Sequence, residues 1–183
     1  MLKLIQELAN CDEKFFRGWL LVKADMQILG TSHKFTHKIL WQRQRKCLIL
    51  VEGFNNDGKC MQSLQVLLLL LPKSLTINNL QINDEVIYTL PHIISQHTFT
   101  KREIDDYILL SGDKNIIHQG ANPIVPGLCM VYFLAQNLHQ DTLHWQIRFN
   151  AKVYAEDKII FTKEAKHIKA YANDKLVFSI KIL

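Results

Sequence analysis

The feature that most constrains the fold is a period-two alternation of apolar and polar residues in the C-terminal third of the chain. Within residues 143–154, apolar side chains such as Trp145 and Ile147 alternate with polar ones. Two more extended stretches, 159–172 and 176–183, follow after turns that contain Asp or Asn. Alternation interrupted by short turns is typical of antiparallel strands with one face buried and one face in water. We therefore predict an antiparallel meander for this part of the chain.

A helix is predicted immediately before the meander. Residues 126–139 are apolar on nearly every side and too long for a strand, which is typical of a buried helix. Pro126 suits the first helical position, because a proline lacks the backbone N–H that has no partner there. A second helix is predicted to start at Thr100 and to end near Gly112, since Thr100 and Glu103 have the spacing of a capping box. Helices against an antiparallel sheet place the chain in the α+β class.

The N-terminal part of the sequence repeats this order of elements. Residues 16–29 align with residues 125–138, with a glycine, an apolar run and a glutamine in matching positions. The alignment predicts a helix over 18–29, followed by a second meander. Its strand-like stretches are 37–42, 47–54 and 60–71, with a hairpin turn at 55–58. A duplicated helix-and-meander unit explains the pattern, although any buried helix followed by a hairpin gives a similar one.

Composition excludes several classes of protein. The strongest apolar run, 66–71, is far shorter than the stretch of about 20 residues that a membrane-spanning helix needs. The start of the chain carries charges every few residues, unlike a secretory signal. The four cysteines include no C-x-x-C pair, which favours a reduced, cytoplasmic protein. The eight histidines form no H-E-x-x-H motif or Cys/His quartet, so we expect no metal site. We expect no cofactor either.

One short segment between the two predicted helices carries residues suited to proton transfer. Asp113, Asn115 and His118 lie within six residues, directly after a helix terminator. Histidine titrates near neutral pH, and a carboxylate can orient it or share its proton. Further along, Gly127 begins the buried helix, whose free N–H groups can receive an oxyanion. Addition of water to a double bond conjugated with a carbonyl needs these parts. The alternative is structural: Asp113 and Asn115 cap a turn, and His118 is an ordinary half-buried residue.

A longer motif around this segment resembles the signature of the MaoC-like, R-specific enoyl-CoA hydratases. That family reads F-[TS]-x-x-[DE]-[IV] into a helix, then [ST]-G-D-x-N-P-[IL]-H, then a loop and P-[IV]-[VA]-H-G-[LM]. The matching residues are Phe99, Thr100, Ile104, Ser111, Gly112, Asp113, Asn115, His118, Pro123, Ile124, Val125, Gly127 and Leu128. The resemblance spans residues 80–183, and its S-G-D-x-N-x-x-H core is fairly specific.

The resemblance implies a hotdog fold, in which an antiparallel β-sheet wraps around a long central helix. Together with the N-terminal repeat, it implies a double hotdog. Residues 1–74 would form a degenerate, non-catalytic half, and residues 75–183 would form the half that carries the catalytic motif.

The resemblance also implies an activity and a site. The activity is that of a hydratase or dehydratase, a lyase of fatty acid metabolism that adds or removes water across the 2,3 double bond of an acyl thioester. The substrate would be an acyl-CoA or acyl-carrier-protein thioester, and the assembly a homo-oligomer such as a dimer, or a pseudo-dimer within one chain. The implied site has a catalytic acid/base pair, three supporting residues and two oxyanion donors: Asp113 and His118; Ser111, Gly112 and Asn115; Gly127 and Leu128.

The chain departs from the family pattern at three points. Ile116 stands where the family has a proline, and Pro126 stands where it has a histidine. The loop between His118 and Pro123 has only four residues, whereas the family has a longer one. Two alternatives therefore stay open: a non-catalytic acyl-thioester-binding protein that kept the motif, and a hotdog thioesterase, which uses differently placed carboxylates.

A basic stretch in the N-terminal part has a plainer interpretation. Lysines and arginines recur between Lys34 and Lys46, which is typical of a solvated strand face. One or two of them could also meet the phosphates of coenzyme A or of a carrier protein. Phe35 and Trp41 lie at apolar alternating positions and are predicted to be core residues, so we expect no nucleic-acid binding here.

Overall fold

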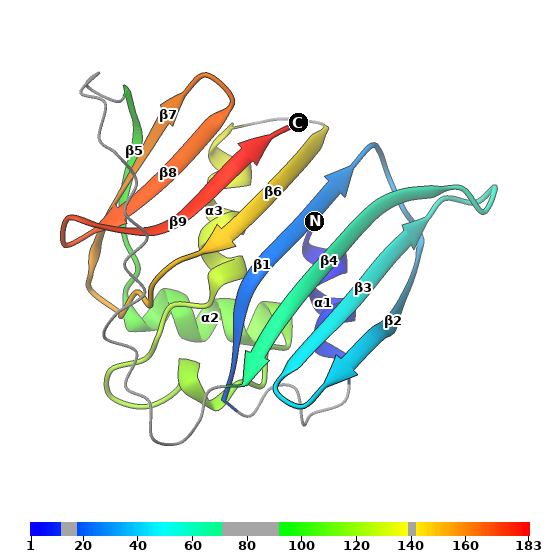
Figure 1. The fold of residues 1–183 in the computed structure, drawn as a ribbon, viewed down its shortest axis with the longest axis horizontal. Helices are drawn as coiled ribbons and strands as arrows, with labels where there is room; N and C mark the ends of the chain where they lie inside the picture. Colours follow the sequence, from blue (N-terminus) through cyan, green and yellow to red (C-terminus); the bar gives the residue numbers. More distant parts are fainter. Residues whose placement is uncertain (12–17, 71–91, 139–141) are drawn as a thin grey trace.

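The computed structural model describes residues 1–11, 18–70, 92–138 and 142–183. Its strands form a single nine-stranded antiparallel sheet, drawn in Figure 1. They are β1 (Trp19–Ile28), β2 (Lys34–Arg43), β3 (Lys46–Phe54), β4 (Cys60–Leu70), β5 (His92–Thr98), β6 (Leu143–Phe149), β7 (Lys158–Glu164), β8 (His167–Ala172) and β9 (Lys175–Ile182). Their order across the sheet is β2-β3-β4-β1-β6-β9-β8-β7-β5.

The α-helices are α1 (Leu2–Ala9), α2 (Lys101–Ser111) and α3 (Gly127–Leu138), and a short 3-10 helix, η2, covers Ile116–His118. In Figure 1, α1 and α3 lie behind the sheet. The predicted buried helix is confirmed as α3, with Pro126 directly before its first residue. The part of the chain that the structure describes contains no helix with the length and apolar character needed to cross a membrane.

The predicted capping box is confirmed at the start of α2. The Thr100 hydroxyl accepts the Glu103 N–H at 3.2 Å, and the Glu103 carboxylate accepts the Thr100 N–H at 2.8 Å. At the other end, Gly112 adopts the left-handed conformation with φ 75°. A residue with a side chain resists that conformation. The glycine therefore fixes where α2 stops and the motif segment starts.

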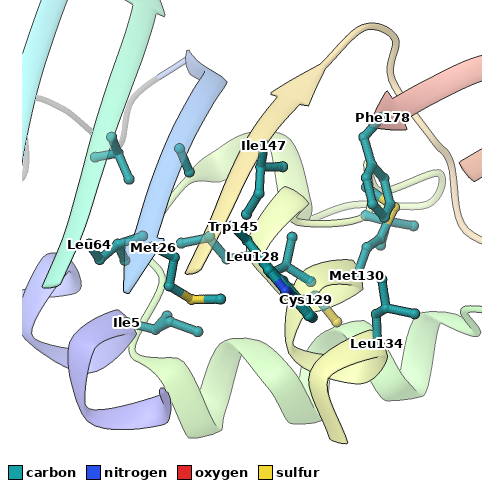
Figure 2. Close-up of a cluster of buried hydrophobic side chains, with 14 of the residues drawn as sticks. Ile5, Met26, Leu64, Leu128, Cys129, Met130, Leu134, Trp145, Ile147 and Phe178 are labelled. Atoms are coloured by element: carbon teal, nitrogen blue, oxygen red, sulfur yellow. The ribbon is translucent and has the colours of Figure 1, made fainter. Parts of the chain in front are cut away.

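A continuous core fills the space between the sheet and its helices. Figure 2 shows α3 residues such as Met130 and Leu134 beside Trp145 of β6 and Phe178 of β9. Residues of α1 join the same core, for example Ile5. Each fully buried side chain of this size contributes on the order of 1.5–3 kcal/mol to the free energy of unfolding. The core that holds the sheet and helices together therefore includes residues near both ends of the chain.

The two parts of the sheet repeat one arrangement. We call α1 with β1–β4 the N-terminal unit and α3 with β6–β9 the C-terminal unit. Outward from the middle, the strands run β1-β4-β3-β2 on one side and β6-β9-β8-β7 on the other. Strands β1 and β6 pair antiparallel, with Asp25 opposite Gln146. The proposed division between residues 74 and 75 lies outside the described residues and stays a prediction.

The predicted helix over 18–29 is wrong, because this stretch forms β1. Ala24 and Met26 are buried, whereas Lys23 is exposed and Gln27 is half-buried, which is the alternation of a strand. The helix of the N-terminal unit is α1, whose buried residues Leu4, Ile5 and Leu8 share one face. Tertiary pairing with β4 and β6 decides the conformation of this apolar stretch.

The prediction for Trp41 is also wrong. A β-bulge between Ile39 and Trp41 shifts the alternation of β2 by one residue, so that Trp41 lies opposite Leu48 instead of Cys47. Its side chain therefore leaves the core face, and Trp41 is 39% exposed. Phe35 precedes the bulge and packs against the core as predicted.

Candidate functional site

The motif segment begins with a turn that is fixed by its own side chains. The Ser111 hydroxyl accepts the Asp113 N–H at 3.3 Å. One carboxylate oxygen of Asp113, Oδ1, accepts the Asn115 N–H at 2.9 Å. An Asp that bonds the backbone two residues ahead is a common way to hold such a turn. The turn leaves the second oxygen, Oδ2, for another partner.

Asn115 ties the motif to the N-terminal unit. Its Nδ2 donates to the Trp19 carbonyl at 2.8 Å, and its Oδ1 accepts the Gly18 N–H at 3.2 Å. The side chain is buried, so both bonds are shielded from water. The sequence indicated only a local role for Asn115, because nothing in it links positions almost one hundred residues apart.

His118 lies at the end of η2 with both ring nitrogens near acceptors. Its Nδ1 is 2.7 Å from the Ile124 carbonyl oxygen, and its Nε2 is 3.6 Å from Asp113 Oδ2. Because a carbonyl oxygen only accepts, Nδ1 carries the hydrogen and Nε2 of the neutral ring carries a lone pair. The structure thus brings the two predicted catalytic side chains to the same place.

Burial sets the charge of the His118 imidazole. The His118 side chain is 8% exposed and the Asp113 side chain is 23% exposed. Burial lowers the pKa of His118 from its ordinary value of 6.5, and it outweighs the opposing effects of the Asp113 carboxylate and the Ile124 carbonyl. The imidazole is therefore neutral at neutral pH, which leaves its Nε2 free to accept a proton.

The predicted oxyanion donors, Gly127 and Leu128, are the first two residues of α3. Amides at this position of a helix have no carbonyl of the preceding turn to bond. A side chain at Gly127 would meet the Phe149 ring, since an added Cβ would lie 2.7 Å from its Cε1 atom. Glycine lets α3 start directly against this ring. His118 is connected to this helix start through the Ile124 carbonyl.

The short loop after His118 forms a closed turn. The Ile124 N–H donates to the Ile117 carbonyl at 3.1 Å, and Ile124 forms a bridge with Tyr154. Gly120 has φ 101°, a conformation that favours glycine. The four residues between His118 and Pro123 are exposed. The shortened loop thus returns the chain straight to the start of α3.

Tyr107 borders the motif and was not singled out from the sequence. Its ring is buried, it shares a hydrogen bond with Ser111, and burial raises its pKa well above the ordinary value. Tyr107 is therefore a neutral phenol that supports the Ser111 end of the turn. Among the residues that the structure describes, no three His, Cys, Asp or Glu side chains gather as a metal site requires.

Comparison with known proteins identifies the fold. No family model matches this chain, and no curated protein matches its sequence. A MaoC-like dehydratase superposes with a TM-score of 0.71 at 10% identity, over 100% of this chain and 82% of that chain. The chain has the hotdog fold. HtdX from Mycobacterium tuberculosis gives a TM-score of 0.67 at 12% identity, over 91% of this chain and 76% of that chain.

The hotdog neighbours include a second kind of enzyme. An acyl-ACP thioesterase from Bacteroides thetaiotaomicron superposes with a TM-score of 0.58 at 11% identity, over 90% of this chain and 75% of that chain. The predicted hotdog fold is confirmed by these matches. At such low identity they establish the fold, and the reaction has to be argued from the site.

Proposed function

We propose that this protein is a hydratase or dehydratase that adds or removes water across the 2,3 double bond of an acyl thioester. The substrate is an enoyl-CoA or an enoyl-carrier-protein thioester. One observation carries the proposal: His118 Nε2 and Asp113 Oδ2 are 3.6 Å apart, and both are acceptors. This separation is longer than an ordinary hydrogen bond, so the two acceptors are placed to bind a third group between them.

A water molecule fits that role, because it can donate one hydrogen to each acceptor. In the hydration direction, the neutral imidazole takes a proton as the water oxygen bonds to C3 of the substrate. The pair then returns a proton to C2, so H and OH add without another reactant. The lowered pKa of His118 keeps the imidazole ready to accept the first proton.

Negative charge develops on the thioester oxygen as C3 is attacked. The first amides of α3, at Gly127 and Leu128, are donors of the kind that stabilises such a charge, and the helix dipole adds to them. Donors fixed before the reaction need no rearrangement when the charge appears. This gives each of the seven motif residues a part: a pair, its supports and an oxyanion site.

The N-terminal unit supports this site without contributing to the chemistry. It lacks a D-x-N-x-x-H segment of its own. Its contribution is the pair of backbone groups at Gly18 and Trp19 that hold Asn115. We therefore assign residues 1–74 to a non-catalytic half and residues 75–183 to the catalytic half.

Hydration of crotonyl-CoA tests the proposal. Loss of the enoyl absorbance should be readily measurable with the unmodified protein and at least about a hundredfold slower for Asp113→Asn and for His118→Ala. Exposed residues of the same kinds provide the matched controls, Asp174→Asn and His167→Ala, which should keep full activity. Equal slow turnover in all four variants, with acyl-CoA binding intact, would favour the non-catalytic binder.

An acyl-CoA assay also distinguishes the proposed hydratase from a thioesterase, an alternative supported by the structural similarity to an acyl-ACP thioesterase. A thioesterase releases free thiol from a saturated acyl-CoA, whereas a hydratase leaves the thioester intact. Thiol release that depends on neither Asp113 nor His118 would favour the thioesterase and contradict the proposal.

A further inference from the structure

The outer face of the sheet, opposite the helices, differs between the two units. Along β6 and β9 its residues are polar: His144, Gln146, Arg148 and Lys181, with Gln146 opposite Lys181. In the N-terminal unit the same face carries a cluster of six apolar residues, which we call the leucine patch. They are Leu20, Trp41, Leu48, Leu50, Leu67 and Leu69.

Strand register brings the leucine patch together. Trp41 lies opposite Leu48, and Leu48 lies opposite Leu67 on the next strand. One row closer to the β2–β3 turn, Leu69 lies opposite Leu20. Their neighbours in sequence, such as Cys47 and Val66, are buried on the helix side, which puts the patch on the outer side.

The patch is solvent-accessible and continuous over four strands. Its leucines are half-buried, Trp41 is exposed, and none of the six belongs to the side chains that pack against the core. Figure 1 shows β1, β4, β3 and β2 side by side, with α1 behind them. A contiguous apolar face of this kind indicates an interaction surface.

Positively charged side chains border the patch at the β2–β3 turn. Arg43, Arg45 and Lys46 are exposed there, with Arg43 opposite Lys46. On β1, the exposed Lys23 lies opposite Leu67. Residues 18–70 carry seven Lys and Arg against three Asp and Glu. Of these, Lys38 is paired with Glu52 at 2.9 Å, so the excess positive charge gathers at the turn.

We propose that the leucine patch and its basic turn bind the surface of an anionic lipid bilayer. Lipid headgroups complement the positive turn, and the interfacial region of the bilayer complements the leucines. Trp41 stands between the two, where an amphipathic ring is favoured at membrane interfaces. The surface does not depend on the proposed hydratase activity, so either can fail alone.

The exposure of the tryptophans supplies a built-in reporter. Trp19 and Trp145 are 6% and 0% exposed, whereas Trp41 is 39% exposed. Insertion of the patch into a bilayer should therefore shift the fluorescence to shorter wavelength through Trp41 alone. Trp41→Phe should abolish the shift while the protein still cosediments with vesicles.

The experiment is a vesicle titration with the full chain, followed by cosedimentation and fluorescence. We expect binding to vesicles of phosphatidylcholine with phosphatidylglycerol, weaker binding as salt is raised, and none to phosphatidylcholine alone. The double variant Arg43→Gln/Lys46→Gln should bind at least about tenfold more weakly. The control Lys169→Gln/Lys181→Gln removes the same charge from the C-terminal unit and should bind as the unmodified protein does.

Several results would overturn the proposal. One is a folded protein that does not bind anionic vesicles, and another is vesicle binding that is weakened equally in both double variants. Binding to soluble polyglutamate without binding to vesicles would identify the surface as one for an acidic protein. Self-association that Trp41→Ala abolishes, without vesicle binding, would identify it as a contact between copies of this chain.

Discussion

At the scale of single residues, the proposed reaction depends on the protonation of one buried imidazole. His118 donates through Nδ1 to a carbonyl, so only Nε2 is available for chemistry. Burial lowers its pKa from 6.5, against the opposing pull of Asp113. The same displacement affects stability, because the unfolded chain holds a proton on this histidine at a pH where the folded chain does not.

The first prediction concerns pH. The free energy of unfolding should include the full contribution of His118 above a pH of about 6.5 and lose it as the pH falls toward the folded pKa. Urea denaturation at a series of pH values measures this loss. His118→Gln should flatten the dependence between pH 7 and pH 5, whereas exposed His167→Gln should leave it unchanged. A steeper dependence in His118→Gln would contradict the assigned direction.

The second prediction concerns the start of α3. Gly127→Ala should lower the free energy of unfolding by about 1–3 kcal/mol, because the new Cβ meets the Phe149 ring. Trimming the ring should relieve the clash, so Gly127→Ala combined with Phe149→Leu should cost less than the two single changes added together. Urea denaturation of the three variants measures this coupling. Simple additivity would mean that the ring moves aside freely.

At the scale of elements, the motif segment is fixed from two directions. Gly112 ends α2, and Ser111 and Asp113 form the turn that follows. Asn115 then attaches that turn to the start of β1. The local part of this arrangement could be predicted, since a capping box, a terminating glycine and an Asp turn are all readable from neighbouring residues. The bond to β1 could not, because it depends on tertiary structure.

The third prediction tests that attachment. Asn115→Ala removes two hydrogen bonds, one to the Trp19 carbonyl and one to the Gly18 N–H, which should lower the free energy of unfolding by about 1–3 kcal/mol. Activity should fall together with stability, because the turn that carries Asp113 loses its anchor. Asn137→Ala, which removes an exposed bond to the Phe133 carbonyl, is the control and should change either quantity little. Full activity in a destabilised Asn115→Ala variant would show that the catalytic pair does not depend on the Asn115 anchor.

Two elements of the N-terminal unit differ from the sequence prediction for physical reasons. The apolar start of β1 has no decisive period, and pairing with β4 and β6 makes it a strand. In β2, the bulge before Trp41 reverses which face each later residue occupies. A bulge on an edge strand also discourages pairing with another sheet, as do Lys34 and Lys38 along the same strand.

At the scale of the whole molecule, the two units form one sheet and one core. The β1–β6 pairing joins them, and core residues of both units belong to a single cluster. The meander and buried helix of the C-terminal unit were predictable from alternation and length. The arrangement of the N-terminal unit required the structure, because α1 and β1 lie outside the stretch that the family resemblance covers.

The fourth prediction follows from the shared core. The full chain should unfold in a single transition, with tryptophan fluorescence and far-UV circular dichroism giving the same midpoint in urea. Trp19 and Trp145 report on different units, so the fluorescence samples both. Two separated transitions would mean that the units are stable independently and that the β1–β6 pairing contributes little.

The most direct test of the central claim follows solvent atoms into the product. Crotonyl-CoA incubated with the protein in deuterated, oxygen-18-labelled water should yield a 3-hydroxyacyl thioester with one labelled oxygen at C3 and one deuterium at C2. Mass spectrometry should find this product formed at least about a hundredfold more slowly by Asp113→Asn and His118→Ala than by the unmodified protein. Equal rates in all three proteins, or no labelled product at all, would contradict the claim that this pair handles water.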